Sequence, residues 1–185
     1  MRKLLSICVL SLIAVTSVMA ADEVKYTMVS KSKLYEIRKY SDRLVIETET
    51  SDKNSGFRKL FKYISGDNKD RKEIKMTTPV TQTEKNGNKI MQFYIPAEFN
   101  ESNVPDPNNS EVKVLNIKGG YYAAIVYSGR ASDGNYTKHK NILKDLLKKD
   151  KISIISKPIR ATYNSPFTLP ILRRNEVIFK IEKNT

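Results

Sequence analysis

Apolar and polar residues alternate in short stretches along much of this chain, with the period of a half-buried β-strand. The first two stretches, 34–40 and 44–50, are separated by the turn sequence Ser41-Asp42-Arg43. Two more turn sequences, Asn86-Gly87-Asn88 and Gly119-Gly120, each separate another pair of stretches. The pattern predicts about eight strands, at 34–40, 44–50, 74–80, 89–95, 112–117, 121–127, 159–163 and 176–182.

The stretch at 74–80 carries a feature that limits its pairing. It is apolar at positions 74, 76 and 80 and polar at 75, 77 and 78, as expected of a half-buried extended segment. Pro79 has no amide proton to donate to a neighbouring strand. We therefore expect this segment to lie at a sheet edge or to leave the sheet at Pro79.

Two stretches show helical spacing instead. Residues 57–65 have an apolar stripe at positions i, i+3, i+4 and i+7, and Ser51 or Asp52 would cap the segment while Gly66 would end it. Residues from about 135 to 149 have a second stripe, with Ser132 or Asp133 as cap and lysines on the solvated side. The two stripes are formed by Phe57, Leu60, Phe61 and Ile64, and by His139, Ile142, Leu143, Leu146 and Leu147.

The predicted elements occur twice in the same order. Residues 34–95 and 112–182 each give strand, strand, helix, strand, strand, which indicates an internal duplication. Residues 96–110, rich in Asn and Pro, form the exposed linker between them. We therefore expect an α+β fold over residues 34–185, in which the duplicated halves form a largely antiparallel curved sheet or barrel of about eight strands flanked by two helices. Residues 21–33 would be an N-terminal extension.

The first twenty residues are typical of a signal peptide. Arg2 and Lys3 precede an apolar run at 4–15, which is too short to span a bilayer, and Val18-Met19-Ala20 is a small-x-small cleavage sequence. Cleavage between Ala20 and Ala21 predicts a periplasmic or secreted protein. It would also remove the single cysteine, at position 8, and so exclude thiolate ligation and a cysteine nucleophile.

The chain is strongly basic. Its formal net charge is +13, and residues 1–20 contain two basic residues and no acid, which leaves +11 after cleavage. Such a charge favours anionic partners. The lysines are scattered, and a periplasmic or secreted protein rarely meets nucleic acid, so we expect no nucleic-acid partner and allow weak contact with an anionic membrane surface.

Two motifs carry a family resemblance. Tyr-Ile-Ser-Gly-Asp-Asn at 63–68, followed by Ile-Lys-Met-Thr-Thr-Pro-Val at 74–80, resembles one signature of the SOUL haem-binding family. Ser-Pro-Phe-Thr-Leu-Pro at 165–170, followed by Arg-Arg-Asn-Glu-Val at 173–177, resembles a second. The resemblance covers nearly all of the chain from about residue 35 and implies an antiparallel barrel flanked by two helices.

The resemblance also implies a site. It places haem, or a related tetrapyrrole, in an apolar groove beside the first helix and the loop before the Arg-Arg-Asn-Glu-Val motif, with basic residues at the propionates. Matched by motif, the groove residues are Phe57, Phe61 and Lys62 on the helix and Phe167, Leu169 and Ile171 in the loop. Thr168-Leu169 stands where haem-binding relatives have a basic residue, so one propionate anchor is missing or is supplied from elsewhere.

His139 is the single histidine of the chain. A histidine on the apolar stripe of a helix is more often a partly buried structural residue than an iron ligand, and both interpretations stay open. One histidine excludes a bis-histidine haem site within one chain. No cluster of His, Cys, Asp and Glu has the spacing of a zinc site, so we expect no metal held by protein ligands alone.

Carboxylates could serve acid–base chemistry. Glu47 and Glu49 are predicted to face the same side of one strand, either as a pair that raises one pKa or, as we favour, as partners of lysines. Glu176 follows Arg173 and Arg174, one of which could hold its carboxylate through two hydrogen bonds. This arrangement would anchor the last strand or serve a ligand.

These observations favour a non-enzymatic protein that binds haem, or a similar planar anionic ligand, without a covalent bond and acts as a carrier or buffer. Two alternatives from other classes remain. One is a small-molecule hydrolase with a glutamate in the cleft between the two halves. The other is an interaction protein at anionic membrane surfaces.

Overall fold

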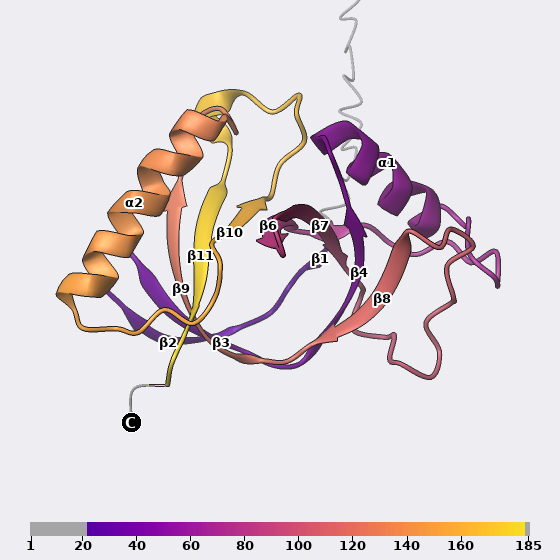
Figure 1. The fold of residues 1–185 in the computed structure, drawn as a ribbon, viewed down its shortest axis with the longest axis horizontal. Coiled ribbons are helices and arrows are strands. Elements are labelled where there is room, and N and C mark those ends of the chain that lie inside the picture. Colours follow the sequence, from indigo (N-terminus) through magenta and orange to yellow (C-terminus); the bar gives the residue numbers. More distant parts are fainter. Residues whose placement is uncertain (1–21, 184–185) are drawn as a thin grey trace, which may run out of the picture.

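Nine strands form one strongly curved antiparallel sheet, and two helices pack on its outer face (Figure 1). The structure is a computed structural model that describes residues 22–183, so the predicted signal peptide lies outside the described residues. The helices are α1 (Lys53–Ile64), α2 (Asp133–Lys149) and the short 3-10 helix η1 (Pro170–Leu172). The strands are β1 (Asp22–Glu23), β2 (Thr27–Lys31), β3 (Glu36–Tyr40), β4 (Arg43–Glu49), β5 (Thr77–Thr78), β6 (Val80–Lys85), β7 (Asn88–Tyr94), β8 (Val112–Ile117), β9 (Gly120–Tyr127), β10 (Ile159–Thr162) and β11 (Asn175–Ile181).

The fold class predicted from the sequence is confirmed. The large sheet has the order β2-β3-β9-β11-β10-β6-β7-β4-β8, and each neighbouring pair is antiparallel. The sheet has one strand more than predicted. The additional strand is β2, which pairs with β3 and lies within the segment 21–33 that we expected to be an N-terminal extension. All five residues of β2 are exposed, so this strand has no apolar alternation by which the sequence could reveal it.

The two half-repeats exchange strands. β3, from the first half, pairs with β9 of the second, and β8, from the second half, pairs with β4 of the first. In the sheet order, the four strands at the α1 end are therefore β6-β7-β4-β8, and their counterparts at the α2 end are β10-β11-β9-β3. The duplication thus gives a pseudo-twofold sheet in which neither half is complete alone.

Helix α1 begins where Asp52 caps it. The Asp52 carboxylate accepts hydrogen bonds from the backbone amides of Asn54 and Ser55, each at 2.8 Å, so the helix starts four residues before the predicted position 57. Its buried residues are Leu60, Tyr63 and Ile64, which pack with Ile46, Met91 and Phe93 of the sheet. The predicted stripe was therefore partly wrong: Tyr63 belongs to the core, whereas Phe57 and Phe61 do not.

Helix α2 follows its predicted course. Ser132 caps it, and Leu143 and Leu147 are its fully buried residues. They pack against Ile125, Val177 and Phe179 on the outer face of β9 and β11. Among the described residues, no helix is long and apolar enough to cross a membrane.

Pro79 interrupts pairing as predicted. β5 ends at Thr78 and pairs with β1 in a separate two-stranded sheet, while β6 begins at Val80 and pairs with β7 and β10 in the large one. The predicted strand 74–80 is thus replaced by β5 and by β6, which extends to Lys85. The expected hairpin turn is present at Asn86-Gly87 between β6 and β7, whereas the expected glycine turn, at Lys118-Gly119, joins β8 and β9, which do not pair with each other.

Buried tyrosines make the stability of the fold decrease with rising pH in the alkaline range. Burial raises the pKa of four tyrosine hydroxyls from 10.0 to about 12, and Asp150 reinforces the effect at Tyr35, whose hydroxyl donates to it at 2.5 Å. The unfolded chain releases these protons near pH 10, so their contribution is complete below pH 10 and is lost as the pH rises to about 12. The four residues are Tyr35, Tyr40, Tyr63 and Tyr136.

We expect the urea midpoint to fall steadily from pH 10 to 12, and the tyrosinate absorbance of the folded protein to develop at higher pH than that of the urea-unfolded protein. Because lysines also lose charge in this range, the comparison of the two absorbance titrations is the decisive one. Coincident titrations of folded and unfolded protein would contradict the prediction.

Candidate functional site

Two phenylalanines form a flat apolar surface on α1. The rings of Phe57 and Phe61 stack at a centroid distance of 5.8 Å with planes 13° apart, and Phe57 also packs edge-on against Phe93 at 5.1 Å. Phe57 is 40% exposed and Phe61 48% exposed. Exposed aromatic residues that are ordered side by side on a helix are a ready surface for an apolar planar ligand.

Two cations lie next to this surface on the following stripe of the same helix. Arg58 and Lys62 are one position after Phe57 and Phe61, so they are neighbours at i and i+4. They line a hollow of about 80 Å³ between α1 and the segment around Pro107. Lys59 in the same hollow pairs with Glu111 at 2.7 Å, whereas Arg58 and Lys62 form no ion pair with any described residue. Lys62 was predicted from the motif, whereas Arg58 was not, although the helical period places it one turn before Lys62 on the same side of α1.

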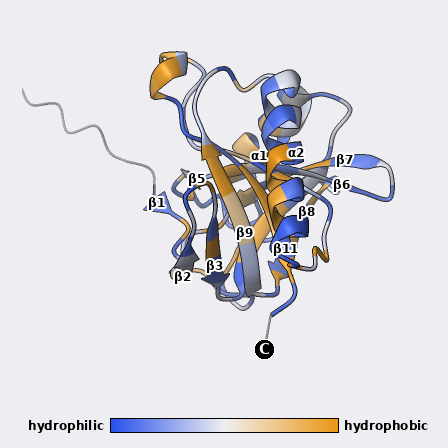
Figure 2. Cartoon of the chain, turned by 90° about the vertical axis from the view of Figure 1, so that its left-hand side faces the viewer, coloured by the Kyte–Doolittle hydropathy of each residue, from blue (hydrophilic) through white to orange (hydrophobic). Residues whose placement is uncertain are grey.

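The loop between β10 and β11 presents apolar side chains to solvent. Phe167 is 94% exposed, Leu169 64% and Ile171 78%. In Figure 2 this loop forms the hydrophobic tip at the top of the molecule. Arg173 gives the loop its shape, because its Nε donates to the carbonyl of Thr168 at 2.7 Å and its Nη2 to that of Pro166 at 2.5 Å. The first arginine of the downstream motif, Arg173, therefore anchors the loop, and the second, Arg174, is the one that contacts Glu176.

The loop and the start of α1 lie at the same upper edge of the molecule in Figure 1. Within residues 22–183, no hydrogen bond, ion pair or ring contact joins Phe57, Phe61 or Lys62 to the loop residues. The two α1 phenylalanines and the three loop residues are all exposed apolar side chains, and the exposed Lys62 lies beside the phenylalanines on α1.

His139 lies on α2, at the other end of the sheet from α1. Its ring stacks on Tyr127 at 4.1 Å with planes 7° apart, and its Nδ1 donates to the Asn135 carbonyl at 2.8 Å. The structure therefore does not bring His139 together with the groove residues. Across the described residues, no group of three or more His, Cys, Asp and Glu could hold a metal ion.

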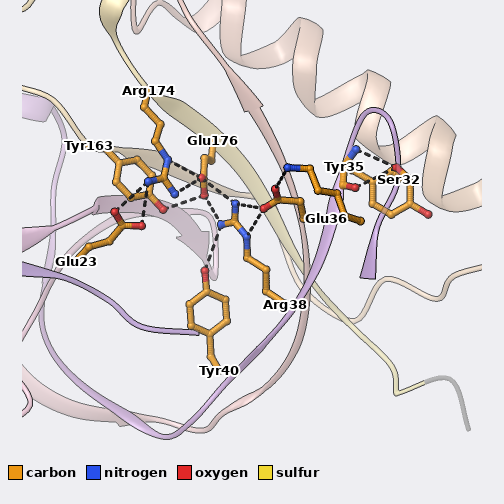
Figure 3. A network of polar contacts seen from close by, with 10 residues as sticks. Glu23, Ser32, Tyr35, Glu36, Arg38, Tyr40, Tyr163, Arg174 and Glu176 are labelled. Atoms are coloured by element: carbon orange, nitrogen blue, oxygen red, sulfur yellow. Dashed lines mark hydrogen bonds and ion pairs between the residues drawn. The ribbon is translucent and has the colours of Figure 1, made fainter. Parts of the chain in front are cut away.

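A buried charge network fills the interior face of the sheet, which is the face turned away from the helices. Glu176 is fully buried on β11 and accepts hydrogen bonds from Arg38 at 2.7 and 3.0 Å, from Arg174 at 2.7 and 3.0 Å and from the Tyr163 hydroxyl at 2.9 Å (Figure 3). The prediction that one arginine holds Glu176 is thus correct for Arg174. Arg38 was missed, because it lies 138 residues away in the sequence.

The contacts of the network shift the pKa values of its members. Burial acts to lower the pKa of Arg38, but the hydrogen bonds and charge of Glu176 outweigh burial and raise it. Burial and the charge of Glu176 raise the pKa of Tyr163. Both oxygens of Glu176 are occupied by cationic donors, so this carboxylate is not placed to act as a free general base.

The two glutamates of β4 have separate partners. Glu47 is almost buried, accepts a hydrogen bond from Gln92 at 2.6 Å and lies 3.9 Å from the Lys85 ammonium. Glu49 is exposed and accepts from Asn88 at 2.9 Å. Pairing with a lysine is confirmed for Glu47, whereas an asparagine takes that place at Glu49. The two carboxylates do not form a catalytic pair.

The comparisons with known proteins agree with the motifs. Residues 21–180 match the SOUL heme-binding protein family. Over 169 residues the chain is 32% identical to heme-binding protein 2 of Homo sapiens and 31% identical to that of Mus musculus, and each match covers 81% of this chain and 78% of the relative.

Solved structures of low identity share the fold. An uncharacterized conserved protein from Listeria innocua superposes with a TM-score of 0.62 at 8% identity, over 83% of this chain and 94% of its own. The C-terminal domain of EcmrR gives a TM-score of 0.61 at 12% identity, over 86% and 99%, and a hydrolase from Listeria innocua gives 0.60 at 8%, over 83% and 94%. At these identities the likeness extends to the fold alone.

Proposed function

Because the chain belongs to the SOUL heme-binding protein family, we propose that it binds haem or a related tetrapyrrole without a covalent bond, as a carrier or buffer. The binding surface we propose is the α1 face with the loop that carries Phe167, Leu169 and Ile171. The observation that supports it most is the exposure of the stacked Phe57 and Phe61, because a sequence that only needed a core would have buried them.

The chemistry of this surface fits a porphyrin. The macrocycle requires a flat apolar contact, which Phe57 and Phe61 offer, and its propionates require cations. Arg58 and Lys62 are the cations without a carboxylate partner beside that contact. They would provide the propionate anchor that is missing at Thr168-Leu169. Arg173 of the loop is not available for this role, because its guanidinium already donates to backbone carbonyls. We propose that the two propionates lie against Arg58 and Lys62, with no axial bond from His139.

A hydrolase is the weaker alternative. Its catalytic glutamate would lie in the cleft between the halves, where Glu176 has both oxygens bound by Arg38 and Arg174. A role at membranes has one observation in its favour, the exposed apolar tip of the loop on a basic protein. The same tip belongs to the proposed haem surface. The signal-peptide pattern of residues 1–20 supports our proposal that the protein works in the periplasm or after secretion.

Titration of the purified protein with hemin tests the proposal. We expect a saturable shift of the Soret band at one equivalent. Replacing both phenylalanines, F57S/F61S, is expected to weaken binding by about tenfold or more, since each exposed ring removed from water by the ligand contributes on the order of 1 kcal/mol. H139A is expected to leave the affinity and the Soret position unchanged.

A pair of matched variants separates specific binding from adsorption to a basic surface. R58Q/K62Q removes two cations at i and i+4 on α1, and K144Q/K148Q removes two at the same spacing on the exposed side of α2. Only the first pair is expected to weaken hemin binding. Equal losses in both pairs, or a Soret change that never saturates, would exclude the proposed surface.

A further inference from the structure

A second, separate space lies on the interior face of the sheet. A small cavity of about 40 Å³ is enclosed there, mainly by tyrosines and aliphatic side chains. A wider groove of about 420 Å³ adjoins it, and the two share Gln92, Ile117 and Ile159 as walls. Neither space contains a residue of α1 or of the loop at 164–172, so this region is distinct from the proposed haem surface.

The guanidinium of Arg43 lies at the inner end of this space. It lies over the ring of Tyr40 at 4.2 Å, near those of Tyr122 at 5.1 Å and Tyr94 at 5.6 Å, and it donates to the Tyr122 hydroxyl at 3.2 Å. Its Nε is buried and has no hydrogen-bond partner. Within residues 22–183 no carboxylate forms an ion pair with it. A buried N–H group normally has a hydrogen-bond partner, so the acceptor expected at the Nε of Arg43 is missing from the described residues.

The neighbouring arginines show what Arg43 lacks. Arg38 and Arg174 divide the oxygens of Glu176 between them, and each also contacts a second carboxylate, Glu36 or Glu23. No further buried carboxylate of the network remains for Arg43. The tyrosine rings stabilise its charge and the Tyr122 hydroxyl accepts from its Nη2, but its Nε–H has no acceptor, and a carboxylate is the acceptor that fits a guanidinium best.

The adjoining groove suits the rest of such a ligand. Its lining includes the apolar side chains of Ile90, Leu115, Ile117 and Ile159, together with two lysines and two carboxylates: Lys85, Lys157, Glu47 and Glu84. The cavity at Arg43 is small, so it suits a small polar group such as a carboxylate and leaves the rest of a ligand to the adjoining groove. The groove therefore places apolar side chains next to the small cavity at Arg43.

We propose that this interior groove is a binding site for small organic carboxylates with an aromatic or aliphatic body, and that Arg43 receives the carboxylate. The body of the ligand packs on the isoleucine and leucine side chains of the groove. This site is additional to the haem surface and does not require it.

Calorimetric titration with 2-naphthoate, compared with 2-naphthylmethylamine, tests the site. The first compound carries the carboxylate on a bicyclic apolar body, and the second inverts the charge on a similar body. We expect saturable binding of the carboxylate alone. R43Q is expected to reduce its affinity by about tenfold or more, as for loss of hydrogen bonds to a charged group. R58Q on α1 is the matched control and is expected to leave the affinity for 2-naphthoate unchanged.

L115E provides a second test that leaves Arg43 and its contacts unchanged. Leu115 is half-buried on β8, and a carboxylate placed there would repel the ligand from within the groove while Arg43 stays intact. We expect L115E to abolish naphthoate binding. Both L115E and R43Q are expected to leave hemin binding unchanged. Binding that survives both variants, or equal binding of the amine, would overturn the proposal. Loss of hemin binding in R58Q/K62Q would bear on the haem surface alone, so the two proposals fail separately.

Discussion

Replacing Glu176 by Gln is expected to lower the free energy of unfolding by about 3–5 kcal/mol, because it removes one partner from a buried ion pair. The variant keeps the shape of the side chain but withdraws the negative charge that compensates Arg38, which is fully buried. The new amide group would also point donor N–H atoms at arginine donors. Arg38 would keep only Glu36 as an anionic partner.

A surface ion pair with the same closest distance is the control. Lys59 and Glu111 are joined at 2.7 Å, the same distance as Arg38 and Glu176, but Glu111 is exposed. E111Q is therefore expected to cost no more than about 1 kcal/mol. Urea unfolding of both variants, followed by circular dichroism, measures the difference. A cost for E176Q as small as that for E111Q would mean that the interior network contributes little to stability.

The sequence predicted the fold well because local patterns specify most of its elements. Both helices, both glycine-containing turns and the repeated order could be recognised from apolar spacing and turn residues. β2 could not, since its side chains are exposed and its place is fixed only by pairing with β3. The exchange of β3 and β8 between the halves is equally invisible, because strand pairing depends on distant partners and leaves no periodic trace.

The candidate sites were predicted less completely, for a related reason. Spacing alone assigned Phe57 and Phe61 to the buried stripe of α1, but the helix is rotated so that Tyr63 is buried and donates its hydroxyl to the Pro105 carbonyl at 2.6 Å. The contact between Arg174 and Glu176 could be predicted because the two residues are only two positions apart in the sequence. The contact of Arg38 with Glu176, and the unpaired state of Arg43, arise only when distant strands meet.

The strand exchange also explains a second large effect, expected at Gly119. The connection from β3 to β4 and the connection from β8 to β9 carry the chain between the two ends of the sheet, and they touch where they pass. A Cβ atom on Gly119 would lie 2.4 Å from the Tyr40 carbonyl oxygen and 2.8 Å from the Ser41 carbonyl carbon. The backbone amide of Gly119 also donates to the Asp42 carboxylate at 2.9 Å, which holds the two connections together.

G119A is therefore expected to destabilise the protein by about 1–3 kcal/mol or more, the range for overpacking that moves backbone. Neither neighbour is a flexible side chain, so the strain must spread into β3 and β9, which pair across the halves. Gly134 is the matched control, because a Cβ there meets no atom within 4 Å and the residue lies in the first turn of α2. G134A is expected to be neutral or stabilising by up to about 1 kcal/mol. Equal urea midpoints for the two variants would show that the two connections are not in contact, and the exchanged arrangement of β3 and β8 would then be wrong.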